Sequence, residues 1–464
     1  MMDLTKGPTF RNMLLYSLPI MLQGSFQIAY NLVDRYWVGN LGASSLGAVT
    51  VGFPVFFFML SLVMGISIGG GIMIAQYRGA DDKEKVNLTA RNFFAVGGIA
   101  VIFISGFMLF YAEQILRLLD TPDDVLPAAT VYMRWIFAGL PAFFIYNAAT
   151  GILRGLGDSK TPTQIAAVTT VLNIIFDPLL IYGYFGIFPR MEVAGAAIAT
   201  VGVNVLGAIA ILVMLGRYRE YVDLTPFGFR FDMKIIRDIL RLGLPSAGTM
   251  MMVSFSMMIF MGLVNKYGTY ALAGYGIGIT LDSLLMMPAQ SFAMAMTNIA
   301  GQNIGAGKIE RVHQYLRDVI RASVAISLVG SLTVILLAKP ITGLFQPDPI
   351  EYEAVLPFVM TYVNIMVVRY FFMSIFFPIN GTIRGAGDAL TSMILIALTQ
   401  LVIRIPAAFI LMNYWGFAGI AAAISISAVF GAIIQSLYYR TGRWIYKGGL
   451  VSLAAIPEDS GVPG

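Results

Sequence analysis

The peptide LRGLGD (153–158) recurs as IRGAGD (383–388), and this repetition guides the interpretation of the whole chain. A second pair has nearly the same offset, because AQYRGADDKEK (75–85) aligns with GQNIGAGKIER (301–311). Matches at an almost constant spacing indicate an internal duplication. The sequence therefore predicts two structurally related halves.

The glycines of the repeated peptides could form a phosphate-binding loop or a helix-ending turn. A phosphate-binding loop requires P-loop or GxGxxG spacing after a strand, which neither repeated peptide has. Glycine also permits the tight turn that ends a helix, so we predict two helix-ending turns at 153–158 and 383–388. Gly65 and Gly69 stand four residues apart in an apolar run, a spacing typical of close helix packing.

Composition predicts a membrane protein. Of the 464 residues, 58% are hydrophobic and only 12% are charged, and the mean hydropathy is +0.78. Soluble domains have about a quarter charged residues, so this surface is not suited to water. The absence of cysteine excludes disulfides, thiolate metal sites and cysteine nucleophiles. The net charge of +5 bears on membrane orientation, and we expect no nucleic-acid partner.

Twelve apolar segments are long enough to cross a membrane as helices, which takes roughly 20 residues each. The sequence thus predicts an all-α integral membrane protein of two six-helix bundles. Because six is even, the bundles share one orientation and are related by a pseudo-twofold axis along the membrane normal. The segments lie at about residues 13–38, 44–76, 90–112, 127–153, 161–183, 193–216, 238–264, 271–302, 318–338, 354–383, 390–412 and 417–439.

Basic residues orient the chain. Most of the 30 Lys and Arg residues fall in the N-terminus, in alternate loops and in the C-terminal tail. By the positive-inside rule both termini are cytoplasmic, and we expect a multi-pass protein of the cell membrane. The predicted parts are an N-terminal lobe, a cytoplasmic linker, a C-terminal lobe and a disordered tail, at 1–215, 216–237, 238–447 and 448–464.

Four polar residues of the N-terminal half are expected at one membrane depth. Asp34 lies in the outer half of the first span, and Thr200 lies about 10 Å below the outer face on the sixth span, at 1.5 Å per residue. Asn173 and Asp177 are one turn apart on the fifth span and share a helix face. Pro178 adds an oxygen, because it leaves the carbonyl of residue 174 without a helical donor.

Ionisable groups within a membrane cost roughly 2.5–3.5 kcal/mol each on insertion scales and usually face a cavity or a partner. Two neighbouring carboxylates at low dielectric favour proton uptake, as a proton carrier requires. With Asn and Thr oxygens added, the same set could coordinate Na⁺. Alternatively, each aspartate only ties helices together. One histidine and no cysteine make any other metal site unexpected.

The C-terminal half carries a different set of buried charges. Asp282, Arg369 and Arg404 lie within the eighth, tenth and eleventh spans. They could form a salt-bridged cluster that holds helices together, or they could line a cavity in this lobe. Methionines gather in the segment 248–262, where they either line a binding surface or fill apolar space.

Several motifs, in order along both halves, resemble the multidrug and toxic compound extrusion (MATE) family and its DinF-like branch. They are Asp34, LGASSLGAV (41–49), QYRGADDKEK (76–85), LRGLGDSKTPT (153–163), NIIFDPLLIYG (173–183) and VAGAAIAT (193–200). The resemblance extends over about residues 10–445. It implies an antiporter, not an enzyme, that exports amphipathic and often cationic organic compounds by alternating access. The coupling ion would be H⁺ or Na⁺, with no cofactor.

The resemblance also implies roles for individual residues. Asp34, Asn173, Asp177 and Thr200 match the cation-coupling site of the DinF-like branch. Tyr132 and Asn147 match the fourth-span residues of the N-lobe network beside the substrate cavity, and Pro19 matches a proline at which the first span bends. The sequence departs from other branches in the C-lobe: they have acidic residues in the seventh and tenth spans, whereas here the seventh has Ser254 and Ser256 and the tenth has Arg369.

We thus expect a monomer whose partners are small organic substrates and membrane lipids. Ion binding at Asp34 and Asp177 would bend the first span at Pro19 and release the substrate outward. One alternative is a lipid-linked saccharide flippase of the same superfamily, which would need a larger cationic cavity than Arg369 and Arg404 suggest. A polytopic membrane enzyme is a further alternative, but no carboxylate or histidine cluster stands at either mouth.

Overall fold

The computed structural model describes residues 1–41, 43–183, 189–225, 230–346 and 348–447, and every regular element in these ranges is a helix. The first half contains α1 (Thr9–Gly39), α2 (Ala43–Gly79), α3 (Lys83–Leu118), α4 (Leu126–Ala138), α5 (Leu140–Gly155), α6 (Lys160–Tyr182), α7 (Glu192–Leu215) and η1 (Gly216–Tyr218). The second contains α8 (Met233–Asn265), α9 (Thr269–Gly305), α10 (Ile309–Phe345), α11 (Pro349–Gly385), α12 (Ala389–Ala397), η2 (Leu398–Ile403), α13 (Arg404–Trp415), α14 (Phe417–Arg440) and α15 (Arg443–Lys447). The predicted disordered tail, 448–464, lies outside the described residues.

The chain is a multi-pass, all-helical membrane protein. Within the described ranges, ten helices are long and apolar enough to cross a membrane, and α4 and α5 together form an eleventh candidate. The 31-residue α1 precedes them, so the arrangement is consistent with the twelve predicted spans. Helices form here because hydrocarbon offers the backbone no hydrogen-bond partners outside the segment itself.

Two predicted spans are not uniform helices. The span expected at 127–153 is bent by 42° between α4 and α5. Gly139 occupies the break, and Pro141 follows in the first turn of α5, where its missing N–H costs nothing. The span expected at 390–412 contains the π-helix η2 between α12 and α13.

Contacts divide the chain into two compact units whose bounds differ from the predicted lobes. Unit 1 comprises Met1–Asp3 and Leu18–Ala247, and unit 2 comprises Leu4–Ser17 and the chain from Gly248 onward. The first turns of α1 therefore belong to unit 2, and the first turns of α8 belong to unit 1. Each half of the duplicated sequence thus contributes the start of its first helix to the other unit.

Hydrogen bonds hold both exchanged segments in place. In unit 2, the carbonyl of Leu4 accepts from the Tyr315 hydroxyl at 3.0 Å and from Nδ2 of Asn303 at 3.2 Å. In unit 1, Oδ1 of Asn92 on α3 accepts from the backbone N–H of Asp232 at 3.0 Å, just before α8. A backbone group at the start of each segment is therefore bonded to side chains of the unit to which it belongs.

Close packing places the start of α8 against α2 inside unit 1. A Cβ atom added at Gly65 would lie 2.4 Å from the Cβ of Ala247, and one added at Gly69 would lie 2.7 Å from the backbone nitrogen of Gly243. The two backbones can approach this closely only because these positions lack side chains. The packing predicted from the Gly65 and Gly69 spacing is confirmed.

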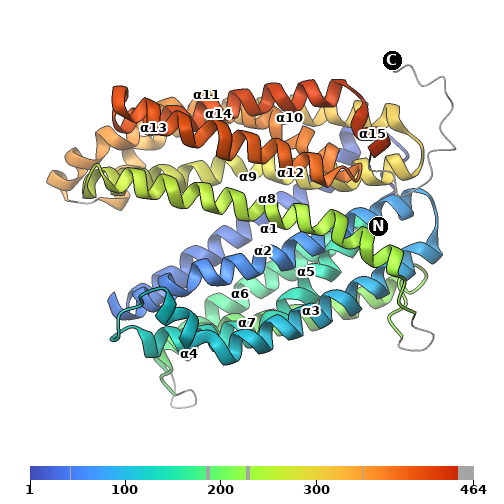
Figure 1. Ribbon diagram of the computed structural model, residues 1–464, viewed down its shortest axis with the longest axis horizontal. Coiled ribbons are helices and arrows are strands. Elements are labelled where there is room, and N and C mark those ends of the chain that lie inside the picture. Colours follow the sequence, from blue (N-terminus) through green and yellow to red (C-terminus); the bar gives the residue numbers. More distant parts are fainter. Residues whose placement is uncertain (42, 184–188, 226–229, 347, 448–464) are drawn as a thin grey trace. The chain divides into compact units, whose positions relative to one another are not determined.

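The two units repeat one another in helix pairing. In unit 1, α2 packs on α5 and α6 packs on α7, while in unit 2, α9 packs on α11 and α13 packs on α14. Within each unit the long helices run alongside one another (Figure 1). The repeated peptides form matching turns, because Gly157 and Gly387 both have a φ of 94°. Glycine adopts this φ without the penalty that other residues incur, so the predicted helix-ending turns are confirmed.

Candidate functional site

The helix α6 brings two of the predicted coupling residues together. Asn173 and Asp177 lie one turn apart on its buried face, and both side chains are fully buried. Nδ2 of Asn173 donates a hydrogen bond to Oδ1 of Asp177 at 2.9 Å. Oδ2 of Asp177 and Oδ1 of Asn173 find no hydrogen-bond partner among the described residues. Two buried acceptor oxygens are thus available to a proton or a cation.

Helix α1 contributes Asp34 to the same region. Asp34 interacts electrostatically with Asp177 across α1 and α6. Both carboxylates also act on the hydroxyl groups of Tyr30 and Tyr132. Tyr30 stands one turn before Asp34 on α1, so the two side chains share a helix face. The structure therefore brings Asp34, Asp177 and Tyr132 into one polar network.

Thr200 joins this network through a residue that the sequence did not single out. Oγ1 of Thr200 on α7 lies 2.9 Å from the Tyr30 hydroxyl, at hydrogen-bond distance. The Thr200 carbonyl is used within its own helix, where it accepts from Nδ2 of Asn204 at 2.7 Å. Tyr30 thus links α1 to α7. The sequence signal that could have identified Tyr30 is its position four residues before Asp34, on the same helix face.

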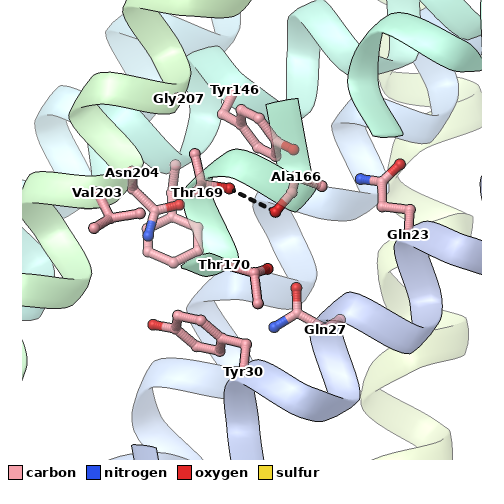
Figure 2. A pocket seen from close by; sticks show the side chains of 11 residues that line it. Gln23, Gln27, Tyr30, Tyr146, Ala166, Thr169, Thr170, Val203, Asn204 and Gly207 are labelled. Carbon is pink, nitrogen blue, oxygen red and sulfur yellow. Dashed lines mark hydrogen bonds between the residues drawn. The ribbon is translucent and has the colours of Figure 1, made fainter. Parts of the chain in front are cut away.

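A pocket in unit 1 lies beside these residues and shares Tyr30 with them. It is formed by α1, α5, α6 and α7. Figure 2 shows polar side chains from several helices around the same space. The lining residues are Gln23, Gln27, Tyr30, Phe143, Tyr146, Ala166, Thr169, Thr170, Val203, Asn204 and Gly207.

The remaining N-lobe residues have distinct surroundings. Asn147 donates from Nδ2 to the carbonyl of Phe143 in its own helix at 2.8 Å, while its neighbour Tyr146 lines the pocket. The Pro19 carbonyl accepts a hydrogen bond from the Thr163 hydroxyl of α6 at 2.7 Å. The lining residues include neither Tyr132 nor Asn147. Asn147 therefore lies beside the pocket wall, and Tyr132 belongs to the polar network of Asp34 and Asp177.

Unit 2 contains the predicted C-lobe charges, and all three are at least largely buried. Arg369 on α11 forms an ion pair with Asp282 on α9. Arg404, at the start of α13, instead donates from Nε to the Ser427 hydroxyl of α14 at 2.8 Å. The salt bridge joins only two of the three residues. Of the methionines in α8, Met257, Met258 and Met261 are exposed.

Comparisons with known proteins agree with this architecture. The MatE family profile matches residues 19–179 and 245–410, one segment in each half. The chain belongs to the MATE family. Among its MATE relatives, the probable multidrug resistance protein YpnP of Bacillus subtilis is 32% identical over 451 residues, which cover 95% of this chain and 97% of that protein. The probable multidrug resistance protein YoeA of the same organism is 31% identical and covers 96% and 95%, respectively.

A solved MATE structure has the same fold. The outward-facing conformation of a multidrug resistance MATE transporter of the MOP superfamily superimposes with a TM-score of 0.89 at 27% identity. The match covers 96% of this chain and 98% of the other. MATE proteins are membrane transporters, so the buried polar residues belong to a transporter.

Proposed function

We propose that this MATE protein exports amphipathic, often cationic organic compounds in exchange for H⁺ or Na⁺. Two relatives that match over nearly their whole length are named as probable multidrug resistance proteins, which supports the export of varied compounds. One geometric observation supports the coupling. Tyr30 lines the pocket and also contacts Thr200 beside the carboxylates Asp34 and Asp177. The comparisons give no support to a saccharide flippase.

The coupling would work through α1. This helix carries Gln23, Gln27 and Tyr30 of the pocket wall and the carboxylate of Asp34. An ion bound between Asp34 and Asp177 neutralises their mutual repulsion and favours a conformation in which they lie close together. A bend of α1 at Pro19 would then change the pocket wall and the affinity for the substrate. Binding of the ion would thereby disfavour binding of the substrate, and the reverse.

The proposal includes an orientation and a setting. We place both termini in the cytoplasm and the protein in the cell membrane as a monomer, with lipids and organic substrates as its partners. The coupling ion is transported and is not a resident cofactor. Carboxylate, amide and hydroxyl oxygens at Asp34, Asp177, Asn173 and Thr200 suit either a proton or a hard cation such as Na⁺.

Transport by proteoliposomes tests the proposal. Efflux of a cationic dye is measured under an imposed pH gradient and, separately, under an imposed Na⁺ gradient. One of these gradients should drive efflux by the unmodified protein, while Asp34→Asn and Asp177→Asn should bind the dye yet lose gradient-driven transport. Asp124→Asn is the matched control, because Asp124 is exposed in the loop before α4. Full coupling by Asp34→Asn would refute the mechanism.

A further inference from the structure

The charged cluster of unit 2 is unbalanced. Asp282 pairs with Arg369, but Arg404 has no acidic partner among the residues that the structure describes. Arg404 is only 7% exposed, and within the described ranges its hydrogen-bond partner is the neutral hydroxyl of Ser427. Nε of Arg369 is also buried and lacks an acceptor within the described part of the chain. Two guanidinium groups therefore share one carboxylate.

The surroundings of the cluster do not supply the missing negative charge. Tyr275 on α9 and Tyr362 and Tyr370 on α11 are buried and lie within electrostatic range of the arginines. A tyrosine hydroxyl is neutral near pH 7, so these residues provide ring faces and dipoles but no counter-charge. A buried cation without a partner costs several kcal/mol, and inside a membrane it usually marks a functional site.

Backbone geometry sets the position of Arg404. The π-helix η2 ends at Ile403, directly before it. A π-turn contains an extra residue, and one added residue rotates the following side chains by about 100° around the helix axis. Such turns interrupt the regular hydrogen bonding of a helix and are frequent at functional sites. The local distortion therefore directs a charge that an ordinary helix would place elsewhere.

The duplicated sequence provides an independent comparison. Asp177 lies on the helix that follows the LRGLGD turn, one residue before Pro178, while Arg404 lies on the helical segment that follows the IRGAGD turn, two residues before Pro406. Corresponding helices thus carry buried charges of opposite sign. The acidic position of unit 1 suits a cation. The basic position of unit 2 suits an anion for the same electrostatic reason.

We propose that unit 2 binds an anionic group of an organic substrate, such as a carboxylate, through the Arg404 guanidinium. The planar guanidinium can donate two parallel hydrogen bonds to a carboxylate or phosphate. Ser427 holds Nε, which leaves the outer nitrogens for the ligand. The inference rests on the proposed export function and extends its substrates from cationic compounds to acids and zwitterions.

A pair of matched dyes tests the proposal on the purified full-length protein. A rhodamine ethyl ester and its free acid share one ring system and differ by a single carboxylate. Fluorescence anisotropy then measures the affinity of each dye for the unmodified protein, for Arg404→Gln and for Arg440→Gln. Arg440 is an exposed arginine of the same unit, so its substitution makes the same change in net charge.

The free acid should lose about ten-fold or more in affinity with Arg404→Gln, as expected when a charged hydrogen-bond partner is removed. The ester should change by less than about two-fold, and Arg440→Gln should affect neither dye. Arg404→Lys should restore part of the affinity for the acid, because lysine keeps the positive charge but cannot donate two parallel hydrogen bonds from one planar group. Ser427→Ala should cause an intermediate loss without changing any charge.

Three results would overturn the proposal. One is equal binding of the acid by the unmodified protein, Arg404→Gln and Arg440→Gln. Another is a loss of affinity for both dyes in Arg404→Gln protein that still elutes as a single folded peak. The third is binding of chloride or inorganic phosphate at Arg404 without any binding of the acid. The site would then hold only an inorganic ion. Normal efflux of the ester in any of these cases would leave the proposed export function intact.

Discussion

The hydroxyl of Tyr218 donates a hydrogen bond to the Asp158 carboxylate at 2.8 Å, and Tyr438 makes the same contact with Asp388 in the other half. Asp158 also accepts from the backbone N–H groups of Lys160 and Thr161 at the start of α6. Burial opposes ionisation, but the hydrogen bonds from Thr161 and Tyr218 hold the pKa of Asp158 below its usual value. Asp158 thus holds the LRGLGD turn against η1, which contains Tyr218.

This contact predicts a pH-dependent contribution to stability. A folded-state pKa below the unfolded value of about 3.9 stabilises the fold above that pH, and the contribution is lost as the pH falls through the lowered pKa. Asp158→Asn should therefore cost about 1 kcal/mol near pH 7 and progressively less below about pH 4. Thermal unfolding in detergent from pH 8 downward measures the difference, with Asp124→Asn as control. A cost that stays constant over this range would contradict the assignment.

The close contact between α2 and α8 predicts steric sensitivity at Gly65. Gly65→Ala places a Cβ atom 2.4 Å from the Cβ of Ala247, so the helices must separate. We expect a loss of about 1–3 kcal/mol in unfolding free energy, typical of overpacking. Gly98→Ala on α3 is the control, because a Cβ there meets nothing within 4 Å and alanine favours a helix. Similar melting temperatures for the two variants would show that the contact is absent.

The hydrogen bond between Asn173 and Asp177 predicts a specific effect on the coupling ion. Asn173→Ala removes the donor to Oδ1 of Asp177 and one oxygen of the proposed site. For Na⁺ coupling, the concentration that gives half-maximal dye efflux should rise about ten-fold, because the site loses one oxygen. For H⁺ coupling it should fall, because the Asp177 carboxylate loses a donor that favours its charged form. Asn147→Ala should have a smaller effect, because among the described residues its amide bonds to Phe143 in the same helix. Comparable shifts in both variants would instead place Asn147 in the coupling network.

The contact between Tyr30 and Thr200 predicts that these residues act as a pair. Tyr30→Phe keeps the ring in the pocket wall but removes the hydroxyl, and Thr200→Val removes the other partner. Each substitution should reduce gradient-driven efflux about five-fold, with dye affinity nearly unchanged. The double variant should be little worse than either single variant, because both remove the same bond. Additive losses would mean that the two residues contribute separately.

Much of the fold could be predicted because membrane burial makes apolar length a direct signal of a helix. The repeated peptides identified the two halves and their turns without any structure. The break at Gly139 had a sequence signal in the following Pro141, but a bend depends on packing as much as on composition. The π-helix before Arg404 had no such signal, because no residue type specifies an extra residue in a turn.

The candidate site was predictable only in part. The spacing of four residues grouped Asn173 with Asp177, and the two side chains are hydrogen-bonded on one helix. It could not show that Thr200 contacts Tyr30, because rotation of α7 relative to α1 is set by packing across the unit. Gln23 and Gln27 were missed for the same reason. A polar residue in a span can face a pocket or a neighbouring helix, and the sequence does not distinguish these environments.

The exchange of first-helix segments has a consequence for how the two halves can be produced and assembled. Leu4–Ser17 belongs to the second unit, and the start of α8 belongs to the first. This arrangement is similar to a domain swap, in which two copies exchange an identical element, but here both copies lie in one chain. Neither half is then a self-sufficient product. Two halves separated by a cut in the linker should assemble only when they are made together, since each must supply the arm that completes the other.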